Sequence, residues 1–159
     1  YQILGTLRHE GSHAIVGILQ GATITEFVFW PTVREQDFYW GYVRYVGETD
    51  WLFLAAPYLV DLLTFVLFFT IYMRVRFRRK WLWLNLIVIG MVSPLVNSLY
   101  NYWGSEGSSN DVGRLFAVLP GELIHGYFIF TLIFYGIGIW IVFRHSRSIY
   151  LPGSKKKRK

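Results

Sequence analysis

The chain has 159 residues and no cysteine, which excludes disulfides and thiolate metal sites. Hydrophobic residues make up 53% of it and aromatic residues 19%, above the usage of ordinary globular domains. The net charge of +6 does not indicate nucleic-acid binding, because 12 of the 16 basic residues fall in two clusters, 74–80 and 144–159. Clusters of this kind flank membrane spans on the cytoplasmic side and attract anionic lipid.

Residues 2–20 predict a helix that is apolar except for the stretch RHEGSH at 8–13. His9 and His13 are four residues apart, so they share one helix face and can bind one ion. Neutral imidazole suits zinc, and catalytic zinc keeps three protein ligands and one open position. Glu10 is then the expected general base, since zinc lowers the pKa of its bound water from ~15.7 to about 7. The alternative is two buried histidines with an ion-paired glutamate, but ionisable residues clustered at membrane depth favour function.

Residues 22–46 are rich in β-branched and aromatic residues and predict a β-hairpin whose polar turn is 31–37. Three apolar blocks long enough to cross a bilayer follow, at 51–73, 81–103 and 126–143.

A polar, Gly/Ser-rich stretch at 104–113 precedes a helix start, and Pro120 is expected to kink or interrupt that helix before the last span. We therefore expect a membrane all-α bundle of about four helices, the last kinked, with a small β-hairpin insertion.

A third metal ligand has to be a carboxylate or a histidine. The candidates in apolar surroundings are Asp61, Asp111, Glu122, His125 and His145. Asp111 at a helix start is favoured, although an acidic residue there also stabilises the helix dipole. Glu122 and His125 could form a second metal half-site or line the kink. Asp61 could hold a helix in place or accept a histidine proton, and His145 is expected at the lipid headgroups.

Three segments together resemble the site-2 protease family of intramembrane zinc metalloproteases, over about residues 1–120. They are HEGSHAIVGILQGATITEF (9–27), LAAPYLVD (54–61) and NDVGRL (110–115). The resemblance implies that His9, His13 and Asp111 bind zinc and that Glu10 is the general base. The reaction it implies is hydrolysis of a peptide bond in or near the transmembrane segment of a membrane-protein substrate.

The sequence departs from the family pattern at two points. Ala56 stands where the family usually has glycine, and the family's longer motif ending in Leu-Asp-Gly is not present around Asp111. We therefore do not assign its substrate-binding asparagine to Asn97 or Asn101. These differences indicate a divergent, peptidase-like branch.

The predicted protein is a multi-pass membrane protein, in the cell membrane, with one metalloprotease-like domain (1–145) and a flexible basic tail (146–159). The alternatives to a zinc endopeptidase are a non-catalytic zinc-binding scaffold or regulator and, third, a transporter component. The basic clusters place 74–80 and the tail in the cytoplasm and the zinc towards the outside, whereas the family usually has its site near the cytosolic face. Because neither an initiator Met nor a signal peptide is present, we expect further residues upstream of Tyr1.

Overall fold

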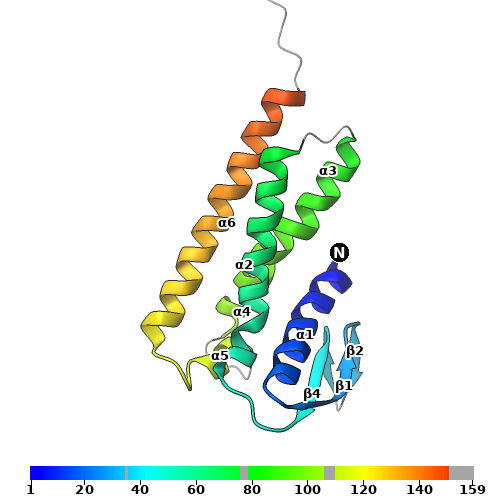
Figure 1. Cartoon of the computed structure of the whole chain (residues 1–159), viewed down its shortest axis with the longest axis vertical. Helices are drawn as coiled ribbons and strands as arrows, with labels where there is room; N and C mark the ends of the chain where they lie inside the picture. Colours follow the sequence, from blue (N-terminus) through cyan, green and yellow to red (C-terminus); the bar gives the residue numbers. More distant parts are fainter. Residues whose placement is uncertain (35, 76–78, 106–109, 151–159) are drawn as a thin grey trace, which may run out of the picture.

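Three long helical segments run side by side along the molecule, and a shorter helix with a small β-structure lies against one end of them (Figure 1). The computed structural model describes residues 1–34, 36–75, 79–105 and 110–150. With the shorter helix, α1 (Gln2–Leu19), the three long segments are the four helices expected from the sequence.

The three long segments correspond to the three apolar blocks and are long and apolar enough to cross a membrane. They are α2 (Trp51–Arg74), the run Lys80–Trp103 and α6 (Gly121–Tyr150), of which Gly121–His145 is the candidate span. Many of their large apolar side chains are exposed, among them Leu63, Leu67, Phe130, Ile133 and Trp140. An apolar surface of this extent is unfavourable in water and is compatible with contact to lipid.

The run Lys80–Trp103 contains a π-helical turn. It consists of α3 (Lys80–Ile87), η1 (Val88–Val92) and α4 (Ser93–Trp103). Gly90 in this turn packs directly against α2, since a Cβ there would lie 2.0 Å from Cγ of Phe68. Pro94 follows the turn and cannot donate a backbone hydrogen bond, which favours a shift out of regular α-helix.

The β-hairpin is confirmed, but its turn is more structured than expected. β1 (Thr23–Val28) pairs antiparallel with β4 (Tyr42–Val46). Within the predicted turn, β2 (Thr32–Arg34) pairs with β3 (Asp37–Tyr39), and Gln36 between them has a positive φ of 78°. The hairpin therefore has a second short ladder at its tip.

The expected kink at Pro120 is a break between two helices. α5 (Asp111–Leu115) ends, a short turn follows, and α6 begins at Gly121 directly after the proline, whose carbonyl accepts from the amides of Leu123 and Ile124. α6 continues to Tyr150, and residues 151–159 of the predicted tail lie outside the described residues.

Two buried clusters hold the helices together. The cluster away from α1 joins α2, α3, η1 and α6 through Phe65, Tyr72, Trp83, Ile87, Met91, Tyr135 and Val142. The cluster next to α1 joins α2, α5 and α6 through Phe53, Leu54, Tyr58, Val112, Leu115, Ile124 and Phe128. The second cluster fixes α5 beside the polar face of α1.

Candidate metal centre

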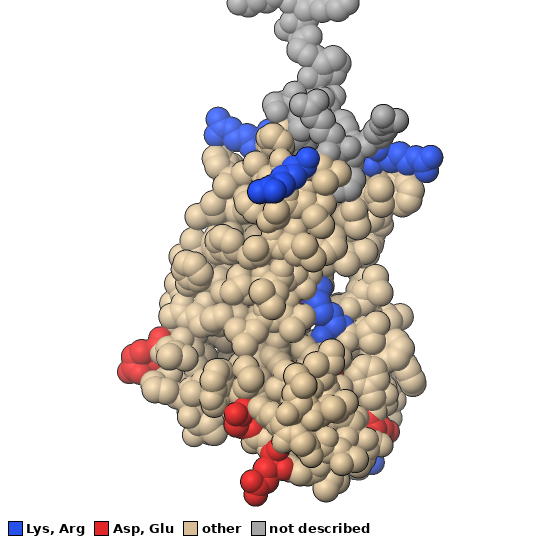
Figure 2. Space-filling model, viewed as in Figure 1, with Lys and Arg blue, Asp and Glu red and all other residues tan. Residues whose placement is uncertain are grey.

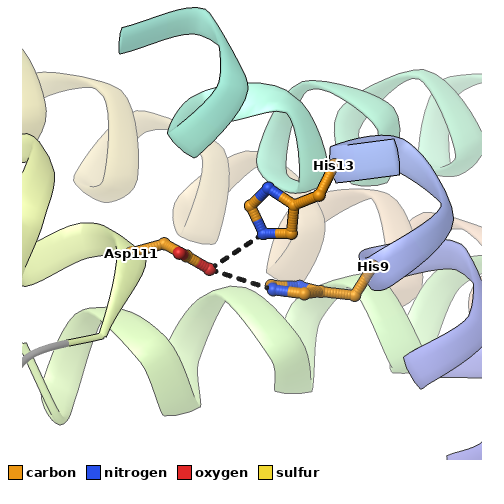
Figure 3. A group of neighbouring side chains, drawn as sticks. All are labelled: His9, His13 and Asp111. Carbon is orange, nitrogen blue, oxygen red and sulfur yellow. Dashed lines mark hydrogen bonds and ion pairs between the residues drawn. The ribbon is translucent and has the colours of Figure 1, made fainter. Parts of the chain in front are cut away.

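Two histidines of α1 and an aspartate of α5 converge on one point (Figure 3). Oδ2 of Asp111 lies 3.0 Å from Nε2 of His13 and 3.2 Å from Nε2 of His9. One nitrogen or oxygen of each of the three residues lies within 4.8 Å of the others. The structure thus brings together the three residues predicted as ligands, in a group that could hold a metal ion.

A backbone carbonyl orients His13. Its Nδ1–H donates to the carbonyl oxygen of Phe53 at 2.8 Å. That oxygen is available because the residue four positions later is Pro57, inside α2, which has no N–H to donate to it. A neutral His13 ring with its proton on Nδ1 presents the lone pair of Nε2 to Asp111.

The contact between Nε2 of His13 and Oδ2 of Asp111 indicates whether these residues fit a metal. The Nε2 lone pair of a neutral His13 faces a carboxylate oxygen at 3.0 Å. Two lone pairs at that distance attract each other only through a proton or a cation between them. Imidazole nitrogens and a carboxylate oxygen are also donors that zinc and similar divalent ions accept. The three residues therefore fit a divalent metal.

Asp111 is held by the cap of its helix. The side chain of Asn110 accepts from the amide of Gly113 at 2.8 Å and donates to the carbonyl of Asn101 in α4 at 3.0 Å. Burial raises the pKa of the Asp111 carboxyl, but the imidazoles of His13 and His9, when protonated and donating at hydrogen-bond distance, outweigh burial and hold its pKa well below the usual range, as a cation in their place would. Asp111 is thus ionised, as a metal ligand must be.

Glu10 lies next to this group and is half-buried. In the described part of the chain no hydrogen bond or ion pair engages its carboxylate, which leaves it available to bind a proton. Its position depends on Gly41 before β4, because a Cβ on Gly41 would lie 3.0 Å from Cγ of Glu10 and 2.5 Å from Cγ2 of Thr6. The hairpin therefore packs tightly against α1 at the predicted catalytic residue.

A cavity of about 410 Å³ opens beside Glu10 and His9. It lies between α1, the η1–α4 segment and the loop before β4. Its polar lining includes Gln2, Thr6, Ser93, Asn97 and Asn101, and its apolar lining includes Trp40, Val88, Val92, Val96 and Tyr100. The cavity is next to the predicted base and is lined by both polar and apolar groups.

Asp61 is not among the metal-ligand candidates that the structure brings together. It is 1% exposed and accepts from Nε of Arg8 at 2.7 Å and from Nδ2 of Asn97 at 2.8 Å. Neither Arg8 nor Asn97 had a role predicted from the sequence. The signal for Arg8 was present, since an arginine in an apolar helix requires a counter-charge and Asp61 is the one acidic residue of the span 51–73.

The remaining candidates lie elsewhere. His125 is exposed and its Nδ1 lies at hydrogen-bond distance, 2.8 Å, from the hydroxyl of Tyr102, while Glu122 and His145 are exposed. Within the residues that the structure describes, the group around Asp111 is the one place where three metal-binding side chains meet. A second metal half-site at Glu122 and His125 therefore lacks a third donor there.

No protein-family model, curated protein or solved structure matches this chain.

Proposed function

We propose that the chain is a zinc-dependent intramembrane endopeptidase. The observation that carries the proposal is the convergence of His9, His13 and Asp111 at the edge of a cavity, next to Glu10, whose carboxylate has no hydrogen-bond or ion-pair partner among the described residues. A purely structural metal site is closed by its ligands, whereas this one has three protein donors and borders open space. That combination is typical of hydrolytic metal sites.

His9, His13 and Asp111 hold the zinc in this proposal. When bound, the zinc supplies a Lewis acid and a nucleophile that forms near neutral pH. Glu10 takes the proton from the attacking water and delivers it to the amine that leaves. Asn110 and the Phe53 carbonyl keep two of the ligands in place through their hydrogen bonds.

The substrate is a membrane protein whose transmembrane segment is locally unwound, because a peptide bond inside a helix is shielded. The cavity between α1 and α4 accommodates the unwound backbone, and Thr6 and Asn101 in its lining offer hydrogen-bonding groups. β1 and β4 form a two-stranded sheet, so each has a second edge to which an extended peptide can add. The polar lining also admits water next to Glu10.

Similarity to the site-2 protease family supports the same assignment. It rests on the order of the HExxH helix, the hairpin, the Pro57 segment and the Asp111 helix along the chain. In this chain the Pro57 segment meets the first helix through the hydrogen bond from His13 to the carbonyl of Phe53.

The charge distribution suggests an orientation in the membrane. Basic residues gather at one end of the molecule and acidic residues towards the other (Figure 2). Exposed Arg74, Arg79, Lys80 and Arg144 mark the basic end, and exposed Glu48, Asp50 and Glu122 mark the other. We place the basic end in the cytoplasm, in contact with anionic lipid, and the metal centre towards the opposite face of the cell membrane.

The decisive experiment measures zinc content and peptide cleavage for the purified full chain and two variants. We expect His13→Ala to lose both zinc and cleavage. Glu10→Gln should keep zinc but cleave about 10²–10⁴-fold more slowly, since it removes general-base catalysis. Zinc binding with no effect of Glu10→Gln on cleavage would rule out the proposed role of Glu10. Zinc binding without any cleavage would favour the scaffold.

A further inference from the structure

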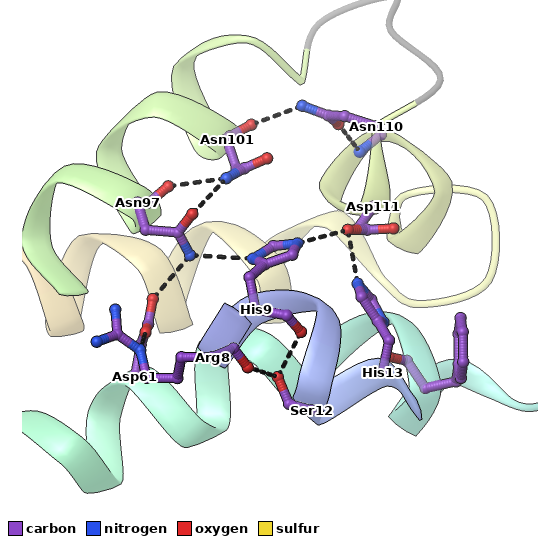
Figure 4. A network of polar contacts seen from close by, with 11 residues as sticks. Arg8, His9, Ser12, His13, Asp61, Asn97, Asn101, Asn110 and Asp111 are labelled. Carbon is purple, nitrogen blue, oxygen red and sulfur yellow. Dashed lines mark hydrogen bonds and ion pairs between the residues drawn. The ribbon is translucent and has the colours of Figure 1, made fainter. Parts of the chain in front are cut away.

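A chain of polar contacts leads from α2 through α4 to the candidate metal centre (Figure 4). Oδ1 of Asp61 accepts from Nε of Arg8 at 2.7 Å. Its other oxygen, Oδ2, accepts from Nδ2 of Asn97 at 2.8 Å, and that nitrogen lies 3.2 Å from Nδ1 of His9. The contacts connect helices α1, α2 and α4, and they end on the ring nitrogen that faces away from Asp111.

The need to neutralise charge explains the contact of Asp61 with Arg8, but it does not explain the contact of Asp61 with Asn97. Asp61 is 1% exposed in an apolar helix, where an unpaired carboxylate costs several kcal/mol. Arg8 supplies the required counter-charge and is itself held by the carbonyl of Ile89 at 3.2 Å and by Oγ of Ser93 at 3.1 Å. The contact from Asn97 satisfies the second oxygen of the buried Asp61 carboxylate and also joins that carboxylate to the side chain beside Nδ1 of His9.

Asn97 is held at both ends of its carboxamide. Its oxygen accepts from Nδ2 of Asn101 at 3.1 Å, and its nitrogen faces both Asp61 and His9. This fixes Nδ1 of His9 towards Asn97 and leaves Nε2 pointing at Asp111. The carbonyl of Phe53 does the same for His13, whose Nε2 also points at Asp111.

We propose that Asp61 and Asn97 are positioning residues for His9 that select Nε2 as its ligand atom and strengthen it as a donor. The inference rests on the proposed metal centre. A neutral imidazole that binds a metal through Nε2 carries its proton on Nδ1, and that proton needs an acceptor.

Asparagine suits this position because its carboxamide both accepts and donates. The nitrogen of Asn97 lies beside both Asp61 and Nδ1 of His9 in the structure, so metal binding through Nε2 would require the carboxamide to rotate about its Cβ–Cγ bond until its oxygen meets the Nδ1–H of His9 while its nitrogen still donates to Asp61. Each contact then has one donor and one acceptor, and the carboxylate at the end of the chain makes the amide oxygen a stronger acceptor.

The test measures the zinc dissociation constant of the full-length protein in detergent, by competition with a chromophoric chelator. We expect Asn97→Leu and Asp61→Asn each to weaken zinc binding by about 10–100-fold, as is usual when the partner of a metal-bound histidine is removed. Asn85→Leu in α3 and Glu26→Gln in β1 make the same chemical changes away from the site and should leave the affinity unchanged. Circular dichroism and gel filtration check that each variant is folded.

An exchange variant separates positioning from the ion pair. Asp61→Asn leaves Arg8 without its carboxylate, so it can weaken binding through packing alone. Asp61→Asn combined with Asn97→Asp also lacks that ion pair, but it places a carboxylate directly beside Nδ1 of His9. We expect the combined variant to recover most of the zinc affinity that Asp61→Asn loses.

Two results would overturn the positioning role. One is wild-type zinc affinity in folded Asn97→Leu, and the other is an exchange variant that binds zinc as weakly as Asp61→Asn. Either result leaves the proposed function standing, provided that the wild-type chain binds zinc and His13→Ala does not. A wild-type chain that binds no zinc would instead overturn the metal centre itself.

Discussion

At the scale of single residues, the position of Glu10 depends on a glycine in another element. Gly41 lies so close to α1 that a Cβ would be 2.5 Å from Cγ2 of Thr6, 2.7 Å from the carbonyl oxygen of Val28 and 3.0 Å from Cγ of Glu10. One of these neighbours is backbone and cannot move without moving β1. A side chain at position 41 must therefore displace the loop from α1.

We expect Gly41→Ala to reduce stability by about 1–3 kcal/mol, the usual range for overpacking. It should also lower cleavage while zinc content is retained, because the loop shifts next to Glu10 but the proposed zinc ligands lie on α1 and α5. Thermal unfolding in detergent measures the loss of stability, zinc analysis measures the retained zinc, and a cleavage assay measures the loss of activity. Gly136→Ala in α6 is the control, since nothing lies within 4 Å of a Cβ there and alanine favours the helix. Equal stability of the two variants would contradict the expectation.

At the scale of elements, two prolines free carbonyl groups that polar side chains of α1 then use. Pro57 cannot donate to the carbonyl of Phe53, which accepts from His13. In the π-helical turn the amide of Ser93 bonds to the carbonyl of Val88, five residues back. The residue five positions after Ile89 is Pro94, so the Ile89 carbonyl is left for Arg8. The irregular backbone of α2 and η1 thus provides free carbonyl groups that accept hydrogen bonds from His13 and Arg8 of α1. These polar side chains are then hydrogen-bonded inside the protein.

Replacing Pro57 tests whether the missing N–H of this proline keeps the carbonyl of Phe53 available to His13. Pro57→Ala restores an N–H that competes with His13 for the carbonyl of Phe53. We expect zinc affinity to fall by about tenfold, as for other losses of a partner of a metal ligand. Thermal stability should stay equal or rise, since a proline inside a helix costs about 3 kcal/mol. Chelator competition and thermal unfolding measure the two effects, and unchanged zinc affinity would show that the orientation of His13 does not depend on Pro57.

The sequence predicted features that depend on local periodicity. The spacing of His9 and His13 places both on one helix face, and the apolar blocks define the three spans by length alone. The sequence did not predict the contact of Asn97 with His9 or of Phe53 with His13. These contacts depend on how neighbouring helices are positioned along one another. The ladder at the hairpin tip was missed because it depends on the positive φ of Gln36, a backbone state unusual for that residue. Whether His9, His13 and Asp111 bind a metal stays a prediction.

At the scale of the whole molecule, the separation of charge makes the orientation testable. The tail carries five basic residues in succession from Lys155 to Lys159, and it follows α6 in the sequence. We expect this end to face the cytoplasm because positive charge is retained there.

Trypsin added to sealed vesicles with the cytoplasmic face outward should remove the tail, and trypsin added to vesicles of the opposite orientation should not. A second label on the hairpin should give the reverse pattern. Cleavage of the tail in the opposite vesicles would instead place the metal centre near the cytosolic face, where the site-2 protease family usually has it.

The acceptors that α1 uses have a consequence for how the protein enters the membrane. Arg8 and His13 find their partners on α2 and η1, both of which are synthesised after α1. Alone in a bilayer, α1 would expose its charged and polar side chains to hydrocarbon. We therefore expect α1 to remain at the insertion machinery or at the lipid surface until α2 and η1 have been synthesised. A nascent chain truncated before Trp51 should leave it extractable by alkaline carbonate.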